Sequence, residues 1–198
     1  MTLSPEVAEH RFVELGLKDA PAMMDRYTQQ GIFGDLEEGK ITPEQFTAEL
    51  ERHVGRSLSF DEVQHCWLGY CREVPVRNLH FLEQLRQAGY RLILLSNTNP
   101  FMMAWAKSPA FSGDKQPIAN YFDACYLSFE MGVMKPAPEF FSRVLMAEQV
   151  PPSECLFVDD GPRNVAAASQ MGMMTLCPEN GSDWTGRVLS ILQANNEE

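Results

Sequence analysis

Three apolar residues that run into two adjacent acids constrain this chain more than any other feature. The stretch extends from Leu156 to Asn164 and has the sequence LFVDDGPRN. A short apolar run bounded by turn residues is typical of a strand that is buried on both faces of a parallel sheet. Asp159 and Asp160 therefore follow the carboxyl end of a strand, where ligands bind in open α/β sheets. Paired carboxylates at this edge favour a Mg²⁺ site, because Mg²⁺ takes oxygen ligands. The alternative is that they cap the next helix.

Length and composition limit the architecture and the classes of partner. A chain of 198 residues can form one domain with a sizeable core, or a core with a small insert. Its formal net charge of -11 argues against a general nucleic-acid surface, although a small anion can still bind in a locally positive pocket. No apolar run approaches the roughly 18 residues of a membrane span, and the first residues, MTLSPEVAEHR, show no signal-peptide pattern. We therefore expect a cytoplasmic protein with no membrane or nucleic-acid partner. Its five cysteines, which include no CxxC pair, are expected to be reduced structural thiols.

The first part of the chain shows helical patterns and predicts a small helical unit over residues 5–74. Thr42 with Gln45, and Ser59 with Glu62, have the spacing of capping boxes at helix starts. Helices are predicted over 5–17, from Asp19 through Tyr27, over 43–54 and over 60–70. The unit is expected to contain four or five helices and no strand.

After Pro75 the pattern changes to alternating helices and strands, which predicts an α/β core over residues 75–185 with a parallel sheet. Strands are expected over 92–96, 124–128, 156–158 and 174–177, and helices over 79–89, 101–106, 138–148 and 165–171. Residues 186–198 are expected to form a short C-terminal helix that frays at its end.

Three polar clusters follow three of these strands and are expected to meet at one edge of the sheet. They are Ser96 to Asn99, Lys135 with Pro136, and Asp159 with Asp160. A hydroxyl with backbone N–H groups can hold phosphoryl oxygens, a lysine supplies a point charge, and two acids can hold Mg²⁺. Taken singly, Ser96 could be a turn residue and Lys135 a solvated lysine. Together and in this order, the clusters favour chemistry on a phosphoryl group.

The order of the clusters resembles the haloacid dehalogenase-like (HAD) superfamily. Its second motif is similar to LILLSNT, its third to MGVMKPAPEFF and its fourth to LFVDDGPRN. The pairing of LSNTNP with FVDDGPRNV resembles small sugar-phosphate (glucose-1-phosphate) phosphatases and the N-terminal phosphatase domain of epoxide hydrolase. The resemblance covers nearly the whole chain and implies a Rossmann-like α/β core with a helical cap, which residues 5–74 would form.

The resemblance also implies roles for individual residues. Ser96 would hydrogen-bond the transferring phosphoryl group with help from Asn97, and Lys135 would neutralise charge on the nucleophile and the phosphoryl oxygens. Asp160 would bind Mg²⁺ directly, with Asp159 close by or acting through water. These roles agree with the physics of phosphoryl transfer, which depends on positioning and charge stabilisation.

Asn164 completes the fourth motif, and the resemblance implies that it orients the loop or the two acids.

The first motif of the superfamily, a strand ending in Asp-x-Asp or Asp-x-Gly-Gly that carries the nucleophile, has no counterpart in this sequence. The residues MTLS resemble those that follow that strand, and Asp19, Asp25 and Asp35 lack a preceding apolar strand. The absent strand would lie between those carrying Ser96 and Asp159, and its loss leaves backbone groups unpaired. We therefore expect an incomplete, inactive chain, for instance from a start codon assigned too late.

Two functional hypotheses follow. The first is a Mg²⁺-dependent phosphatase that acts on a small phosphomonoester, such as a sugar phosphate, through an aspartyl-phosphate. The second is a catalytically inactive HAD-like protein that binds a phosphorylated ligand or a protein partner. A dehalogenase is a weaker hypothesis, because it uses no metal. The sequence specifies neither the substrate nor the oligomeric state. By position alone, Ile32, Phe33, Trp67 and Tyr70 could contact the substrate, although packing within the cap is the favoured alternative.

Overall fold

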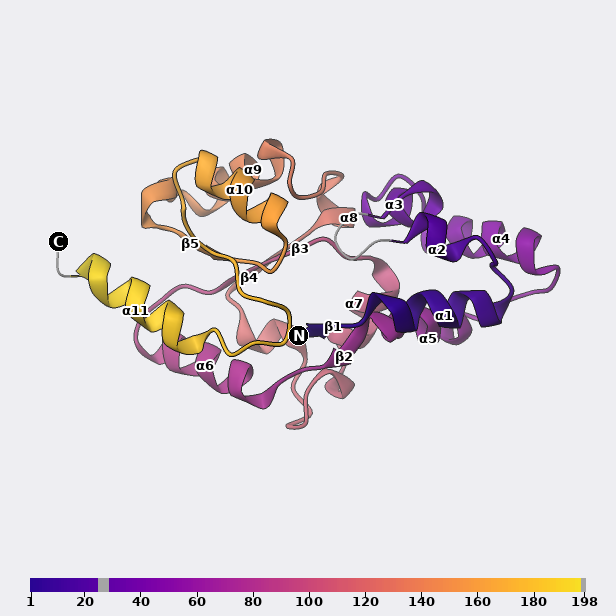
Figure 1. Cartoon of the computed structure of the whole chain (residues 1–198), viewed down its shortest axis with the longest axis horizontal. Coiled ribbons are helices and arrows are strands. Elements are labelled where there is room, and N and C mark those ends of the chain that lie inside the picture. Colours follow the sequence, from indigo (N-terminus) through magenta and orange to yellow (C-terminus); the bar gives the residue numbers. More distant parts are fainter. Residues whose placement is uncertain (25–28, 197–198) are drawn as a thin grey trace. The chain divides into compact units, whose positions relative to one another are not determined.

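The computed structural model describes residues 1–24 and 29–196, so the expectations for Asp25 and Tyr27 lie outside the described residues. It divides the chain into two compact units, 1–134 and 135–198 (Figure 1). The first unit contains β1 (Thr2–Leu3), α1 (Pro5–Leu15), α2 (Ala20–Met23), α3 (Gly31–Glu37), α4 (Pro43–Val54), α5 (Phe60–Trp67), β2 (Cys71–Glu73), α6 (Val76–Gln87), β3 (Ile93–Ser96), α7 (Pro100–Ala106), β4 (Ala124–Leu127) and α8 (Ser128–Met131), with 3-10 turns η1 (Leu68–Tyr70), η2 (Pro109–Phe111) and η3 (Ile118–Tyr121). The second contains α9 (Pro138–Glu148), η4 (Pro152–Glu154), β5 (Leu156–Val158), α10 (Pro162–Gln170), β6 (Met174–Leu176) and α11 (Thr185–Asn196).

Helices α1 to α5 surround an aromatic cluster inside the first unit, and Figure 1 shows them grouped together. The Phe12 ring lies 5.0 Å from that of Phe33 and 5.6 Å from that of Trp67, in edge-on arrangements that aromatic pairs prefer. Phe46 packs edge-on against Phe33 at 5.2 Å. Phe33, Trp67 and Tyr70 are therefore core residues, as the packing alternative predicted, rather than substrate contacts.

Both predicted capping boxes are confirmed. The Thr42 hydroxyl accepts a hydrogen bond from the Gln45 N–H at 3.2 Å, and the Gln45 side chain accepts one from the Thr42 N–H at 2.8 Å. Ser59 and Glu62 exchange the same pair of bonds at the start of α5, at 3.2 and 2.9 Å. Each box satisfies N–H groups that a helix start otherwise leaves without partners.

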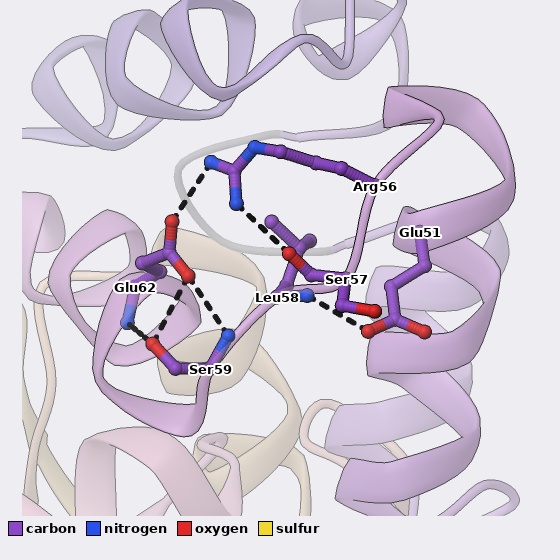
Figure 2. A network of polar contacts seen from close by, with 6 residues as sticks. All are labelled: Glu51, Arg56, Ser57, Leu58, Ser59 and Glu62. Carbon is purple, nitrogen blue, oxygen red and sulfur yellow. Dashed lines mark hydrogen bonds and ion pairs between the residues drawn. The ribbon is translucent and has the colours of Figure 1, made fainter.

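The loop between α4 and α5 is held by a polar network that is drawn in Figure 2. Arg56 forms an ion pair with Glu62 at 2.8 Å, and the Leu58 N–H donates to Glu51 at 2.8 Å. The hydrogen bond from Arg56, together with the bonds from Ser59, lowers the pKa of Glu62 to about 2. The network fixes how α5 follows α4 in the chain.

The expectation of no strand before Pro75 is wrong, because Cys71–Glu73 forms β2 and pairs antiparallel with β1. The three residues of β2 are too few for an alternating pattern to show in the sequence. The chain of η1 also passes very close to α1, since a Cβ on Gly69 would lie 2.6 Å from the backbone of Ala8. The β1–β2 ribbon ties the start of the helical region to its end.

The parallel sheet of the first unit consists of β3 and β4, in a register that pairs Ile93 with Ala124 and Ser96 with Leu127. Both strands agree with the sequence prediction to within a residue or two. The side chains packed under them come mainly from α6, α7 and the turns before β4; they are Leu79, Met103, Ala106, Phe111, Tyr121 and Leu127. This packing fixes the carboxyl end of β3, where Ser96 lies.

The second unit has its own parallel pair, in which Leu156 of β5 lies opposite Met174 of β6 and Val158 opposite Leu176. Phe157 packs edge-on against Phe141 of α9 at 5.3 Å. The predicted parallel pairing is confirmed, but among the described residues the ladders β3–β4 and β5–β6 remain separate. Leu156 and Val158 are only half-buried, contrary to the expected burial on both faces, because a two-stranded ladder covers less of each strand.

The observed division at residues 134/135 differs from the predicted boundaries after residues 74 and 185, which stay predictions. In the first unit, α7 contributes to two hydrophobic clusters: Phe101 and Met102 pack in the aromatic cluster of α1 to α5, and Met103 and Ala106 pack in the cluster under β3 and β4. The C-terminal helix is confirmed as α11. None of the described helices is long and apolar enough to cross a membrane.

Candidate active site

A buried ion pair lies at the carboxyl end of β5. The Lys135 Nζ atom is 2.6 Å from Asp159 Oδ2, and the two side chains are only 6% and 12% exposed. Lys135 Nζ also lies 5.4 Å from the centre of the Phe157 ring, within the range of a cation–π contact. Removing two charges from water costs free energy unless further hydrogen bonds hold them. Such bonds are present around Asp159.

The second oxygen of Asp159 is held by the turn that leads into α10. Asp159 Oδ1 accepts hydrogen bonds from the Gly161 N–H at 2.8 Å and from Asn164 Nδ2 at 3.0 Å. A Cβ on Gly161 would come within 2.9 Å of Asp159 Oδ1 and 2.8 Å of Asn164 Nδ2, so a larger residue here would displace the two hydrogen-bonded side chains. Asn164 thus orients an acid, as predicted. Gly161, not an acid, occupies the N-cap position of α10, so the capping alternative is not supported.

Asp160 lies in an environment that disfavours its own negative charge. Burial raises the pKa of its carboxyl, and the neighbouring charge of Asp159 raises it further, while Lys135 opposes the rise. A cation beside Asp160 would relieve this cost. No group of three or more His, Cys, Asp and Glu side chains within the described residues could hold a metal. The donor set suits Mg²⁺, which is commonly bound through one or two carboxylates and keeps waters or phosphate oxygens as its other ligands.

In the first unit, the polar loop after β3 is fixed by its neighbours. The buried Ser128 hydroxyl at the start of α8 donates to the Thr98 carbonyl at 3.1 Å and accepts from the Thr98 N–H at 3.0 Å. Asn99 caps α7, because its Oδ1 accepts from the Met102 N–H at 3.1 Å. The half-buried Ser96 hydroxyl, at the end of β3, makes only a long 3.4 Å contact to the Asn97 carbonyl among the described residues. It can therefore donate to another acceptor.

The structure also reveals a buried acid that the sequence interpretation missed. Glu37 is the last residue of α3 and is 8% exposed. Burial raises its pKa to about 8, an effect that the neighbouring Asn99 amide opposes. The signal was present in the sequence, since Glu37 follows Phe33 and Leu36 at helical spacing and so lies on the apolar face of α3.

Comparison with known proteins identifies the family to which the chain belongs. A family model described as haloacid dehalogenase-like hydrolase matches residues 75–172. The D-ribitol-5-phosphate phosphatase of Bacteroides thetaiotaomicron is 44% identical over 187 residues, which cover 94% of this chain and 90% of that protein. The chain belongs to the haloacid dehalogenase-like hydrolase family.

Solved structures of HAD proteins agree with the α/β fold described above. A HAD-like family hydrolase from Porphyromonas gingivalis superimposes with a TM-score of 0.92 and 36% identity, over 98% of this chain and 92% of that one. A HAD family enzyme from B. thetaiotaomicron, in complex with magnesium and inorganic phosphate, gives a TM-score of 0.82 and 31% identity, over 92% and 90% of the two chains. The same enzyme was also crystallised with magnesium and phosphate as an aspartate-to-alanine mutant.

For this HAD family member, the structure brings together Lys135, Asp159 and Asn164, with Asp160 next in the chain. Ser96 and Asn97 end β3 in the first unit. A counterpart of the nucleophile motif is not found in the described part of the chain. In particular, Asp19 precedes α2 and Asp35 lies within α3, so neither follows a strand.

Proposed function

We propose that this protein is a Mg²⁺-dependent phosphatase that acts on a small phosphomonoester such as a sugar or polyol phosphate. The observation that carries the proposal is the buried Lys135–Asp159 pair with Asp160 beside it, a charge arrangement suited to holding a cation and a phosphoryl group. The similarity to a D-ribitol-5-phosphate phosphatase supports a phosphorylated polyol as the substrate class.

In this proposal, Lys135 and Ser96 act on the phosphoryl oxygens. Lys135 is a point charge that its bond to Asp159 holds in place, and it neutralises charge on the phosphoryl group and on the attacking group. Ser96 donates its hydroxyl to a phosphoryl oxygen, and Asn97 adds its backbone or side chain. Fixing these donors in advance lowers the cost of the charge that builds up during transfer.

We assign the metal site to Asp160 as the direct ligand, with Asp159 close by or acting through water. Asp159 already holds Lys135, Gly161 and Asn164, which leaves Asp160 as the carboxylate with the greater need for a cation. Bound Mg²⁺ would supply positive charge against the phosphoryl oxygens. The Mg²⁺ complexes of the B. thetaiotaomicron enzyme support this assignment.

The proposed nucleophile is an aspartate on a strand that the described residues do not include. The separate ladders β3–β4 and β5–β6 support this part of the proposal, because an added strand would find edges to pair with. In the first step the bond between phosphorus and the substrate's ester oxygen breaks, the alcohol leaves, and the aspartate becomes an aspartyl-phosphate; in the second step water hydrolyses it to inorganic phosphate and restores the aspartate. Without such an aspartate, the alternative function is that of an inactive HAD-like protein that binds a phosphorylated ligand.

The deciding experiment uses the native protein purified from its source. Its intact mass is compared with that of the 198-residue chain, and release of phosphate from D-ribitol 5-phosphate is measured with Mg²⁺ and with EDTA. We expect a mass larger by roughly ten residues or more, enough for a strand and its turn, and hydrolysis that EDTA abolishes. A mass equal to the 198-residue chain, with ligand binding but no hydrolysis, would establish the binding function instead.

We propose a cytoplasmic enzyme whose partner is a small phosphorylated metabolite and not nucleic acid or membrane. The net charge of -11 supports the exclusion of nucleic acid, because a phosphate backbone is bound by clustered positive charge.

A further inference from the structure

One buried hydroxyl group holds the chain just beyond Ser96 through two hydrogen bonds. The Ser128 side chain, at the start of α8, is fully buried. Its Oγ atom accepts a hydrogen bond from the Thr98 N–H at 3.0 Å and donates one to the Thr98 carbonyl at 3.1 Å. A serine hydroxyl can donate and accept at the same time, so this single side chain satisfies both backbone groups of the buried Thr98.

These two bonds begin where the β3–β4 ladder ends. The last paired residues of the ladder are Ser96 and Leu127. Thr98 lies two residues beyond Ser96, and Ser128 is the residue after Leu127. The Ser128 hydroxyl therefore supplies the hydrogen bonds that the backbone of a neighbouring strand gives within a ladder. Asn97, between Ser96 and Thr98, is thereby held on both sides.

Ser128 is itself held in place by the residues around it. The Gly132 N–H donates to the Ser128 carbonyl at 2.9 Å and closes the single turn of α8. A Cβ on Gly39 would clash with the Phe129 carbonyl oxygen, so the chain after α3 packs directly on α8. The hydroxyl can therefore fix the position of Thr98 instead of following its movements.

The other end of the loop after β3 is fixed by α7. Asn99 is fully buried, and its Oδ1 accepts a hydrogen bond from the Met102 N–H at 3.1 Å. Thr98 and Asn99 are thus both buried and hydrogen-bonded, whereas Ser96 and Asn97 are only half-buried. The two residues proposed to bind phosphoryl oxygens are the more accessible part of a loop that is anchored on each side.

We propose that Ser128 is a positioning residue that fixes Ser96 and Asn97 in the conformation that binds phosphoryl oxygens. The inference rests on the proposed phosphatase function and adds to it a residue that does not touch the substrate. Donors that are fixed before the substrate arrives stabilise the transferring charge without a cost of reorganisation. Without the Ser128 hydroxyl, the loop would have to become ordered when phosphate binds, which weakens binding.

The chain contains a matched control in Ser112. Its hydroxyl accepts from the Gln116 N–H at 2.9 Å and donates to the Gln116 carbonyl at 3.1 Å, the same pair of bonds that Ser128 makes to Thr98. Ser112 is also buried and accepts a longer bond from the Tyr121 hydroxyl at 3.3 Å. Its bonds hold the loop between η2 and η3, so Ser112→Ala removes at least as many bonds as Ser128→Ala but releases a different segment.

The test compares the wild type, Ser128→Ala and Ser112→Ala, each produced in the length that the intact mass of the native protein establishes. Calorimetric titration with inorganic phosphate in Mg²⁺ gives the Kd, and denaturant unfolding gives the free energy of unfolding. We expect both variants to lose stability, because each leaves buried backbone groups unpaired. Only Ser128→Ala should bind phosphate more weakly, by about tenfold, the order of effect expected when a backbone segment becomes ordered during binding.

The outcomes separate the inference from the proposed function. A folded Ser128→Ala protein that binds phosphate as tightly as the wild type would overturn the inference and leave the phosphatase proposal intact. An equal loss of affinity in Ser112→Ala would also overturn it, because affinity would then follow stability in general. If the wild type binds no phosphate, the proposed function fails, and the inference fails with it.

A second measurement covers the case in which Ser128→Ala does not fold. Hydrogen exchange of the Thr98 amide is followed by NMR in the wild type, with and without phosphate. We expect this amide to be protected in the free protein and equally protected in the complex, because the Ser128 hydroxyl already binds it. Protection that arises only with phosphate would show that the ligand orders the loop, and the inference would be wrong.

Discussion

Lys135 Nζ and Asp159 Oδ2 are 2.6 Å apart, although 24 residues separate them in the chain, and both side chains are almost excluded from solvent. Each charge depends on the other, because a buried charge without a partner is far more costly than a buried pair. The pair therefore contributes to stability as well as to the proposed chemistry, and the two contributions can be measured separately.

Lys135→Ala should lower the free energy of unfolding by about 3 to 5 kcal/mol, because it leaves Asp159 buried and uncompensated. Denaturant unfolding measures the loss. The matched control is Lys107→Ala, which breaks an exposed ion pair with Glu130 and should cost no more than about 1 kcal/mol. Equal losses in the two variants would contradict the central role of the buried pair.

The sequence predicted those helices and strands whose start, end and spacing are specified by residues close together in the chain. The helix expected over 138–148 is α9 without a change of boundary, since Pro138 begins it and its apolar residues keep helical spacing. Helix α6 begins three residues earlier than expected, because Pro75 takes the N-cap position. Helix α3 was not predicted, since Gly31 and Gly34 weaken its pattern.

The candidate site shows the same limit. The sequence placed Lys135 and Asp159 at strand ends, but their direct ion pair depends on how the segment before α9 packs against β5. The helical spacing of α3 indicates which face carries Glu37, but no local pattern specifies the close approach of Gly39 to Phe129 of α8, about 90 residues further along the chain. Contacts of this kind are set by tertiary packing, which the propensity of a short segment does not determine.

Asp160→Asn should abolish the stabilisation that Mg²⁺ gives to the folded protein. In the wild type, Mg²⁺ offsets the burial and the Asp159 charge that together raise the pKa of Asp160, so added Mg²⁺ should raise the Tm. The variant keeps the shape of the side chain but lacks the charge that binds the cation. Thermal unfolding with increasing Mg²⁺ tests this, and an equal rise in Tm for both proteins would remove Asp160 from the metal site.

The same variant has an expected pH dependence in metal-free protein. Because the pKa of Asp160 is raised in the folded protein, folding favours the protonated carboxyl. The full free energy of unfolding is therefore present at low pH, and part of it is lost as the pH rises through the folded pKa. Asp160→Asn should therefore be more stable than the metal-free wild type at pH 7 and similar to it near pH 3. Asp114→Asn, in an exposed loop, serves as the control, and its stability relative to the wild type should be the same at both pH values.

Arg56→Ala should raise the pKa of Glu62 from about 2 toward the ordinary value near 4.5. The Arg56 guanidinium makes the largest contribution to lowering this pKa, followed by the bonds from Ser59. In the wild type, the stability linked to ionised Glu62 is fully present above about pH 4.5 and is lost as pH falls toward 2. An NMR titration of the Glu62 carboxyl measures both values, and a wild-type midpoint near 4.5 would show that the network in Figure 2 does not hold in solution.

Gly69→Ala should destabilise the protein by about 1 to 3 kcal/mol, the usual cost of forcing an extra carbon into a packed site. The added Cβ would lie 2.6 Å from backbone atoms of Ala8, so η1 and α1 would have to move apart, and the β1–β2 ribbon beside them would be strained. Gly186→Ala is the matched control, because its Cβ would meet open space in α11 and a helical alanine is favoured over glycine. Denaturant unfolding should show a loss for Gly69→Ala and no loss, or a small gain, for Gly186→Ala. A Gly69→Ala variant as stable as the wild type would mean that the approach of η1 to α1 is looser than 2.6 Å implies.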